Sequence, residues 1–329
     1  MHTLHEKSPC CRDKVRRYGA RRRQCAKCDH TWRVWQRKRG RRRRRRHPRA
    51  FVQYVSRAAP PVYIAAQQRG VPRTTAQRHL IESRDTFATH TAWPAIPKGP
   101  LIAVADAWVR YLEGSWHCWY AILVRAVDGD EAVLTPVTYV QGRETITGWK
   151  QAFDALRSSV TARIAALVCD GHRGLVFEAR WRHWHLQRCH FHLIAAIQGR
   201  RSRWGASRHQ QEGERLYALV RTLLITRDPT VRTDRINELE VFGWDTHSPQ
   251  LKKIIQGFLN NLDDYRTYLE YPGLHLPRTS NTVEVFFSFV EELCHRAHGF
   301  ATPHALHQWI VALAKYKAKI KCNGYQPNL

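Results

Sequence analysis

LIAVADAWVRYLEGSWHCWYAILVRAV, residues 101–127, is the stretch of sequence that decides the fold. It contains two apolar runs rich in Val, Ile, Trp and Tyr, and Glu113-Gly114-Ser115 separates them, which predicts a β-hairpin. Asp128-Gly129 then turns the chain into a third predicted strand, EAVLTPVTYV, residues 131–140. One acid, Asp106, lies in the middle of the first run among apolar neighbours.

The residues that follow change from strand to helix periodicity. Apolar side chains at helical spacing predict an amphipathic helix over residues 145–159, and RIAALVCD, residues 163–170, predicts a short buried strand. Further helices are expected at 174–182 and 189–197, with an extended piece between them, then through the polar region 200–272, and finally at 281–296 and 303–319. Three antiparallel strands, a helix, a parallel strand and then helices predict an α/β fold with a mixed sheet.

The positive charge is concentrated at the N-terminus. The chain of 329 residues carries a formal net charge of +27, and 20 of its 54 Lys and Arg residues lie in the first 50 positions, against three acids. So many cations favour a polyanionic partner, for which DNA is the expectation and a merely solvated tail the alternative. The low-complexity segment 37–49 cannot build a core and is predicted to be a basic linker whose DNA contacts include Arg41, Arg42, Arg43 and Arg44.

Four N-terminal cysteines have metal-ligand spacing. Cys25-x-x-Cys28 places two thiolates on one tight turn, and Cys11 lies 14 residues upstream. Ser8 stands where a second knuckle would have its outer ligand, so the fourth ligand is open between Cys10 and a histidine, His5 or His30. We expect a zinc-ribbon-like module at residues 1–36 with a structural Zn²⁺ held by Cys10, Cys11, Cys25 and Cys28.

Residues 50–90 are predicted to form short helices, and PPVYIAAQQRGVPRTTAQRHL, residues 60–80, fits a helix-turn-helix with Gly70 at the turn. The start of the second helix would face base edges with Thr74, Thr75, Gln77 and Arg78. An ordinary helical hairpin in a connector is the alternative.

Three carboxylates are candidates for catalysis. An ionised Asp106 in a strand is costly unless it binds a metal or a hydrogen-bond partner. Asp170 ends a buried strand, at the edge where α/β folds bind ligands, although Asp170-Gly171 could also be a plain turn. Glu284 lies in the first turn of a predicted helix, where it could instead close a capping box with Asn281. Together the three could hold two Mg²⁺ ions for phosphoryl transfer.

Cys189 and His192 have C-x-x-H spacing, which is compatible with a zinc pair or with a packed Cys and a hydrogen-bonded His. The sequence contains no P-loop, nucleophile elbow or dinucleotide fingerprint, so no nucleotide cofactor is expected. No apolar run is long enough for a membrane span, and the N-terminus lacks a secretory h-region. A cytoplasmic, nucleoid-associated protein is expected.

Four segments resemble prokaryotic Mutator-type insertion-sequence transposases, closest to the group with an N-terminal zinc-binding segment. They are VADAW (104–108), VCDGHRGL (168–175), QRCHFHL (187–193) and LPRTSNTVEVFFSFVEELCHRAHGF (276–300). The resemblance implies an RNase H-like DDE catalytic domain at residues 100–320, with a helical insertion at about 200–275 that accounts for the long gap between Asp170 and Glu284.

The resemblance also implies roles for individual residues. Asp106, Asp170 and Glu284 would be the ligands of catalytic Mg²⁺ or Mn²⁺, and Cys189 and His192 the pair between the second and third acids. The expected activity is binding of terminal inverted repeats, strand cleavage and strand transfer, by a homodimer or larger assembly on DNA.

Two other functions are compatible with the sequence. One is an RNase H-like nuclease that cuts without joining, and the other is a DNA-binding regulator on an inactive transposase fold. The three intact acids argue against the regulator, and the DNA-binding N-terminal half exceeds what a simple nuclease needs.

Overall fold

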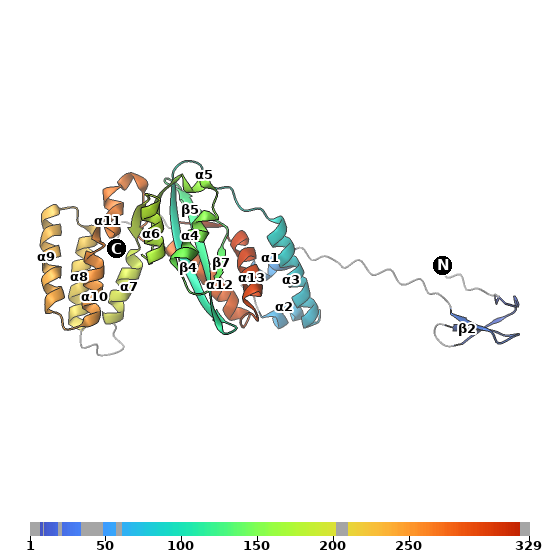
Figure 1. The fold of residues 1–329 in the computed structure, drawn as a ribbon. Coiled ribbons are helices and arrows are strands. Elements are labelled where there is room, and N and C mark those ends of the chain that lie inside the picture. Colours follow the sequence, from blue (N-terminus) through green and yellow to red (C-terminus); the bar gives the residue numbers. More distant parts are fainter. Residues whose placement is uncertain are drawn as a thin grey trace. The chain divides into compact units, whose positions relative to one another are not determined.

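The structure, a computed structural model, describes residues 7–8, 10–18, 22–33, 49–56, 61–201 and 210–322. Arg41, Arg42, Arg43 and Arg44, with the rest of the segment 37–48, lie outside the described residues. The chain divides into two units, residues 1–47 and 48–329, each with its own internal contacts (Figure 1).

The first unit contains a small antiparallel sheet in the order β1 (Val15–Arg17), β2 (Arg22–Cys25) and β3 (Thr31–Arg33). Its second strand ends at the buried Cys25, and the turn that follows carries Cys28. Asp29 adopts a left-handed conformation, with φ of 56°, where the chain reverses into β3. The sheet is therefore short, and the cysteines lie at its turns.

The second unit is built on a mixed sheet of seven strands in the order β10-β6-β5-β4-β8-β9, with β7 also paired to β5. The strands are β4 (Leu101–Leu112), β5 (Ser115–Ala126), β6 (Glu131–Leu134), β7 (Thr138–Gln141), β8 (Ile164–Cys169), β9 (His185–Arg188) and β10 (Lys319–Lys321). β4 and β5 form the predicted hairpin, and the positive φ angles of Glu113 and Gly114 make its two-residue turn. β8 runs parallel to β4, so the expected mixed sheet is confirmed.

Two edges of the sheet differ from the prediction. The expected third strand, residues 131–140, is divided into β6 and β7, and both parts pair with β5. Pro136 lies between them and has no N–H to donate to a ladder. At the C-terminus, the helix expected at 303–319 ends at Tyr316, and the next residues form β10 beside β6.

Helices cover both faces of the sheet. In β4, Ile102 and Val104 point into one hydrophobic cluster and Ala103 and Ala105 into another, as the alternation of a strand requires. The first cluster includes side chains of α12 (Asn281–Arg296), α13 (Pro303–Tyr316) and the N-terminal helices of this unit. The second includes side chains of α4 (Ile146–Asp154), α5 (Ser158–Thr161) and α6 (Arg173–Trp181). By the same alternation, Asp106 belongs to the face covered by α12.

Three helices precede the sheet: α1 (Ala50–Ser56), α2 (Val62–Gln68) and α3 (Arg73–His90). They pack on α13, where the ring of Phe51 lies 5.7 Å from that of Trp309 and Arg84 donates to Gln308 at 2.7 Å. Gly70, with φ of 59°, allows the tight turn between α2 and α3. The helices predicted at residues 50–90 are therefore present, and they share a hydrophobic cluster with the sheet.

A helical bundle interrupts the sheet domain between β9 and α12. It consists of α7 (His190–Arg201), α8 (Gln210–Ile225), α9 (Pro229–Asp245), α10 (Pro249–Leu259) and α11 (Leu262–Glu270), followed by the 3₁₀ helix η1 (Pro272–Leu274). The five α-helices have a separate hydrophobic core. Gln187 of β9 fixes the bundle to the sheet: its amide donates to Tyr265 O at 3.0 Å and accepts from Tyr268 N at 2.9 Å.

Within the described residues, the helices are all too short or too polar to cross a lipid bilayer.

Candidate active site and cysteine cluster

Asp106 lies on β4, and Asp170 directly follows the neighbouring parallel strand β8, at the same level of the sheet. Val104 of β4 pairs with Val168 of β8, and each acid lies two residues further along its own chain. Backbone amides orient both carboxylates: Ala107 N donates to Asp106 Oδ1 at 2.8 Å, and His172 N donates to Asp170 Oδ1 at 2.8 Å. The bond from His172 N closes a local turn at Asp170, which is the feature that the plain-turn alternative predicts. It engages only Oδ1, so Oδ2 of Asp170 can bind another partner.

Glu284 approaches the same face from the first turn of α12. Ser280 Oγ donates to Glu284 Oε1 at 2.8 Å, whereas Ser280 N donates to Cys189 Sγ at 3.3 Å. A capping box would need a backbone amide at the start of the helix to donate a hydrogen bond to the glutamate side chain. No such bond to Glu284 is present among the described residues, so the side chain is held by Ser280, and its charge acts on Asp106.

The electrostatics of Asp106 show that the three acids interact. Burial, together with the negative charges of Asp170 and Glu284, raises the pKa of Asp106 to about 7, and the Ala107 amide and the positive charge of His192 act in the opposite direction. The site thus concentrates negative charge in a partly buried place. Carboxylate oxygens are the ligands that Mg²⁺ and Mn²⁺ prefer, and a bound cation would offset the repulsion, so the donor set fits such a metal.

Cys189 and His192 lie beside Glu284. Cys189, immediately before α7, is fully buried, and ligand atoms of Cys189, His192 and Glu284 all lie within 4.8 Å of one another. His192 Nδ1 is 3.8 Å from Glu284 Oε1. The hydrogen bond with Cys189 raises the pKa of His192 to about 9, and the charge of Glu284 adds to this effect. The three side chains form one cluster, whose ligand atoms are close enough to hold a metal ion, so both alternatives for Cys189 and His192 stay open.

Sequence reasoning did not identify Glu144, which also borders the site. Its Oε1 accepts from Trp149 Nε1 at 2.6 Å and lies 3.2 Å from His172 Nδ1. Burial raises the pKa of Glu144 to about 7, and the charge of Asp170 contributes. Glu144 lies in a loop without periodicity, so only its place in the fold reveals it. Ser280 could have been predicted from the sequence, because it lies in the segment 276–300 that carries the family resemblance, four residues before Glu284.

Gly171 allows a close approach directly after Asp170. Its φ is 94°, a conformation that favours glycine, and a Cβ at this position would lie 2.0 Å from Arg188 Nη2. Arg188 Nη2 donates to the Gly171 carbonyl at 2.9 Å. This bond ties the end of β9 to the loop that carries the second acid.

The cysteine cluster in residues 1–47 brings together four sulfurs. Those of Cys10, Cys11, Cys25 and Cys28 all lie within 4.8 Å of one another, and Cys10 Sγ is 3.4 Å from Cys28 Sγ. A Zn–S bond of about 2.3 Å in a tetrahedron gives S–S edges of about 3.8 Å, so this group could hold a structural zinc ion. Of the candidates for the fourth ligand, Cys10 is the one that joins the described cluster.

Ser8 has a different role from the ligand it replaces in the motif. It is 2% exposed, and its hydroxyl accepts from Asp13 N at 3.1 Å, which closes the loop that carries Cys10 and Cys11. The hydroxyl also lies 3.2 Å from Cys25 Sγ and lowers the pKa of Cys25 to about 6. This favours the thiolate, the form that binds metals.

The proposed base-reading residues begin α3. Thr74, Gln77 and Arg78 are exposed and Thr75 is partly exposed, whereas Ala76 and Leu80 on the opposite side are buried against α1 and α2. The turn between α2 and α3 is therefore supported by packing, and the polar side of α3 is accessible.

A family model described as "Transposase, Mutator family" matches residues 110–315, which is more than half of the chain. The matched region contains Asp170, Cys189, His192 and Glu284, and it begins four residues after Asp106. No curated protein matches the chain.

Proposed function

The chain belongs to the Mutator family of transposases, and from this membership we propose that it binds the terminal inverted repeats of a mobile element and cuts and rejoins DNA with Asp106, Asp170 and Glu284. The proposed catalytic domain is RNase H-like, spans residues 100–320 and carries its helical insertion at about 200–275.

The observation that carries the proposal is the convergence of the three acids. They come from β4, from the end of β8 and from the first turn of α12, and the charges of Asp170 and Glu284 both oppose the ionisation of Asp106. Residues that lie 64 and 114 positions apart in sequence thus share one electrostatic environment. Acids without a common ligand gain nothing from this arrangement, because their mutual repulsion destabilises the fold.

The three carboxylates would hold Mg²⁺ or Mn²⁺. Such ions would supply activation of a water or 3′-hydroxyl and charge stabilisation for the leaving oxygen of the phosphate. The protein's own part is to fix the ligands: amides of Ala107 and His172 orient the two aspartates, and the Ser280 hydroxyl orients Glu284. His192, whose pKa is about 9, is a cation at neutral pH and would attract a DNA phosphate to this edge.

DNA recognition is assigned to the N-terminal segments. We propose that α2 and α3 act as a helix-turn-helix, with Thr74, Thr75, Gln77 and Arg78 against base edges, and that residues 1–36 form a zinc-stabilised module. Arg41, Arg42, Arg43 and Arg44 would contact phosphates. Because two element ends must be joined in concert, the active form on DNA is proposed to be a homodimer or larger.

The test begins with the DNA that flanks the gene. Inverted repeats identified there are used as labelled substrates for the purified protein with a target plasmid, in the presence of Mg²⁺ or of a chelator. We expect cleavage at the repeat ends and covalent joining to the plasmid, both lost with the chelator. Cleavage without joining would identify a nuclease instead, and sequence-specific binding with no cleavage would identify a regulator.

A further inference from the structure

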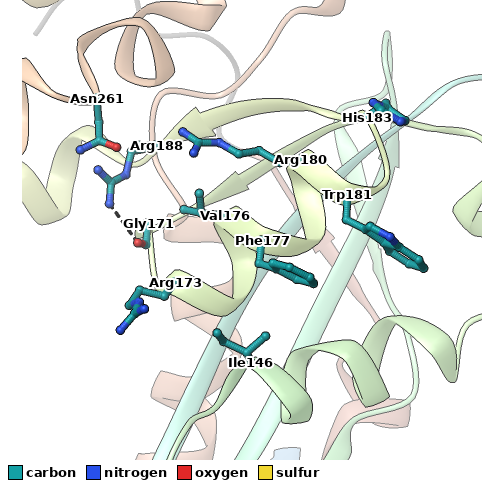
Figure 2. Close-up of a pocket in the computed structure, with 10 residues that line it drawn as sticks. All are labelled: Ile146, Gly171, Arg173, Val176, Phe177, Arg180, Trp181, His183, Arg188 and Asn261. Carbon is teal, nitrogen blue, oxygen red and sulfur yellow. Dashed lines mark hydrogen bonds between the residues drawn. The ribbon is translucent and has the colours of Figure 1, made fainter.

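A recess of about 760 Å³ runs along α6, next to the second acid of the candidate site. Figure 2 shows its lining, in which Gly171, the residue after Asp170, lies at one end of α6 and His183 lies just beyond the other. This volume lies within the range of small-molecule sites, but the recess is open to solvent along one side. Of its lining residues, Arg188 and Gly171 are the two that also take part in the candidate active site, through the hydrogen bond between them.

Two aromatic rings in this lining are exposed. Phe177 is 48% exposed and Trp181 is 57% exposed, and they lie four residues apart, so they share one side of the helix. In Figure 2 both rings project from α6 in the same direction. The opposite side of the helix is anchored by Leu175 and Ala179, which are fully buried. About half of each ring is therefore left uncovered by the packing of α6, and the two rings lie together beside the recess, where a contiguous exposed apolar patch is a candidate binding surface.

Cationic groups accompany the rings. Arg182 and Lys150 approach the Trp181 ring, with distances to its centroid of 5.1 and 5.8 Å. Both are also paired with Asp154, at 2.6 and 2.8 Å, so the cations left to contact a ligand are those that line the recess. Arg173, Arg180 and Arg188 line the recess itself. Arg180 Nη2 forms an ion pair with Asp264 Oδ2 at 3.6 Å. The buried Nε of Arg188 has no hydrogen-bond partner among the described residues. The recess therefore presents flat apolar rings within a positively charged border.

We propose that this recess binds an unpaired stretch of DNA beside the phosphate that is cut, with a base stacked on Trp181 or Phe177 and its backbone held by the arginines. Aromatic rings between cations are the arrangement that binds single-stranded nucleic acid without regard to sequence. A closed duplex cannot use it, because the faces of its bases are already stacked on one another. The inference rests on the proposed function and adds to it the strand state of the DNA at the site.

The test is photochemical cross-linking of the full-length protein. The probe is a short oligothymidylate that contains one 5-iododeoxyuridine, with the matching closed duplex as a second probe. We expect the single strand to cross-link to the peptide that contains α6, and the duplex to give little of this product. Trp181→Ala should lower the yield at α6 about tenfold, the loss expected of one base–aromatic stack, and Trp181→Phe should restore much of it.

Trp244→Ala is the matched control, because Trp244 is 82% exposed on α9 and does not line the recess. This variant should cross-link as the wild type does. The same probe is also applied to the Asp106→Asn chain, whose cleavage is measured in parallel. Cleavage tests the catalytic assignment and the cross-link tests the recess, so either proposal can fail while the other holds. The inference is overturned if the single strand cross-links only outside α6, if the duplex is equally effective, or if Trp181→Ala changes self-association and leaves the cross-link intact.

Discussion

Asp106 and Asp170 each lie two residues beyond the paired Val104 and Val168 of two parallel strands. The ladder therefore sets the relation between the two acids, and no loop between them has to be ordered first. The third acid is added by a helix that packs on the same face. This arrangement makes the candidate site a property of the sheet itself, and it has measurable consequences.

Asp106→Asn, Asp170→Asn and Glu284→Gln should each lower Mg²⁺-dependent cleavage by at least about 100-fold, while DNA binding stays close to that of the wild type. Each change keeps the shape of the side chain and removes one charged ligand. Glu292→Gln is the matched control, because Glu292 lies on the same helix but pairs with Arg296. Near wild-type cleavage by one of the three variants would remove that residue from the assignment.

The purified protein should contain one zinc ion per chain bound to the N-terminal cysteines. Cys25→Ser should abolish this content, whereas Ser8→Ala should retain it, because the Ser8 hydroxyl closes the loop and is not a ligand. Cys322→Ser, far from the cluster in sequence, is the control. Metal analysis after gel filtration measures the content, and loss of zinc from Ser8→Ala would show that the hydroxyl is a ligand.

Gly171→Ala should destabilise the protein by about 1–3 kcal/mol, since it forces an L side chain into a strained backbone conformation. The new Cβ also displaces Arg188, so cleavage should fall as well. Gly273→Ala is the control: a Cβ there meets nothing within 4 Å, and little change is expected. Urea unfolding measures both, and equal stability of Gly171→Ala and the wild type would contradict the conformational argument.

Truncation of residues 1–47 should weaken binding to all DNA and flatten its salt dependence, because fewer phosphates are neutralised. Gln77→Ala and Arg78→Ala should instead reduce the preference for the element end, by about 1–3 kcal/mol for each side chain that no longer pairs with a base edge. Titrations of cognate and unrelated duplexes at several salt concentrations separate the effects. An unchanged slope after truncation would exclude phosphate contacts from the first unit.

Acid should destabilise the fold through His190. Burial lowers the pKa of His190 to about 4, from an ordinary value of 6.5, and its Nε2 lies 2.7 Å from Tyr265 O. The unfolded chain therefore binds the proton more readily, so stability from this group is complete above pH 6.5 and declines toward pH 4. Urea unfolding should show a loss of about 2 kcal/mol from His190 between pH 7 and pH 5. His190→Gln should lack this part of the loss, and an equal loss in the variant would assign the acid sensitivity elsewhere.

The parts of the fold that were predicted correctly have strong local patterns. The hairpin of β4 and β5 follows from two long apolar runs and a tight turn, and the strand before Asp170 from a short, continuous apolar run. The edge strands did not carry such a signal. β10 has three residues, two of them lysines, and becomes a strand because β6 offers an open edge.

The candidate site divides in the same way. Asp106 could be proposed from the sequence because an ionised acid among apolar residues is costly unless it binds a metal or a hydrogen-bond partner. Cys25 and Cys28 could be proposed because their spacing is typical of metal ligands. Glu144 could not be predicted, because its neighbours Trp149 and His172 are set by tertiary packing. The position of Cys10 beside the other three cysteines likewise depends on how the loop closes on Ser8, and His5 lies outside the described residues.

The junction of Cys189 with Ser280 has a consequence for evolution and engineering. Ser280 N donates to Cys189 Sγ and His190 N donates to Arg278 O at 2.8 Å, so the entry and the exit of the helical bundle are fastened to each other beside Glu284. Everything between them, α7 through η1, leaves and returns at one point, and most of it has its own core. Helices α8 to α10 can therefore vary in length and surface with little effect on the third acid, whereas α11 must be kept because Gln187 of β9 binds it.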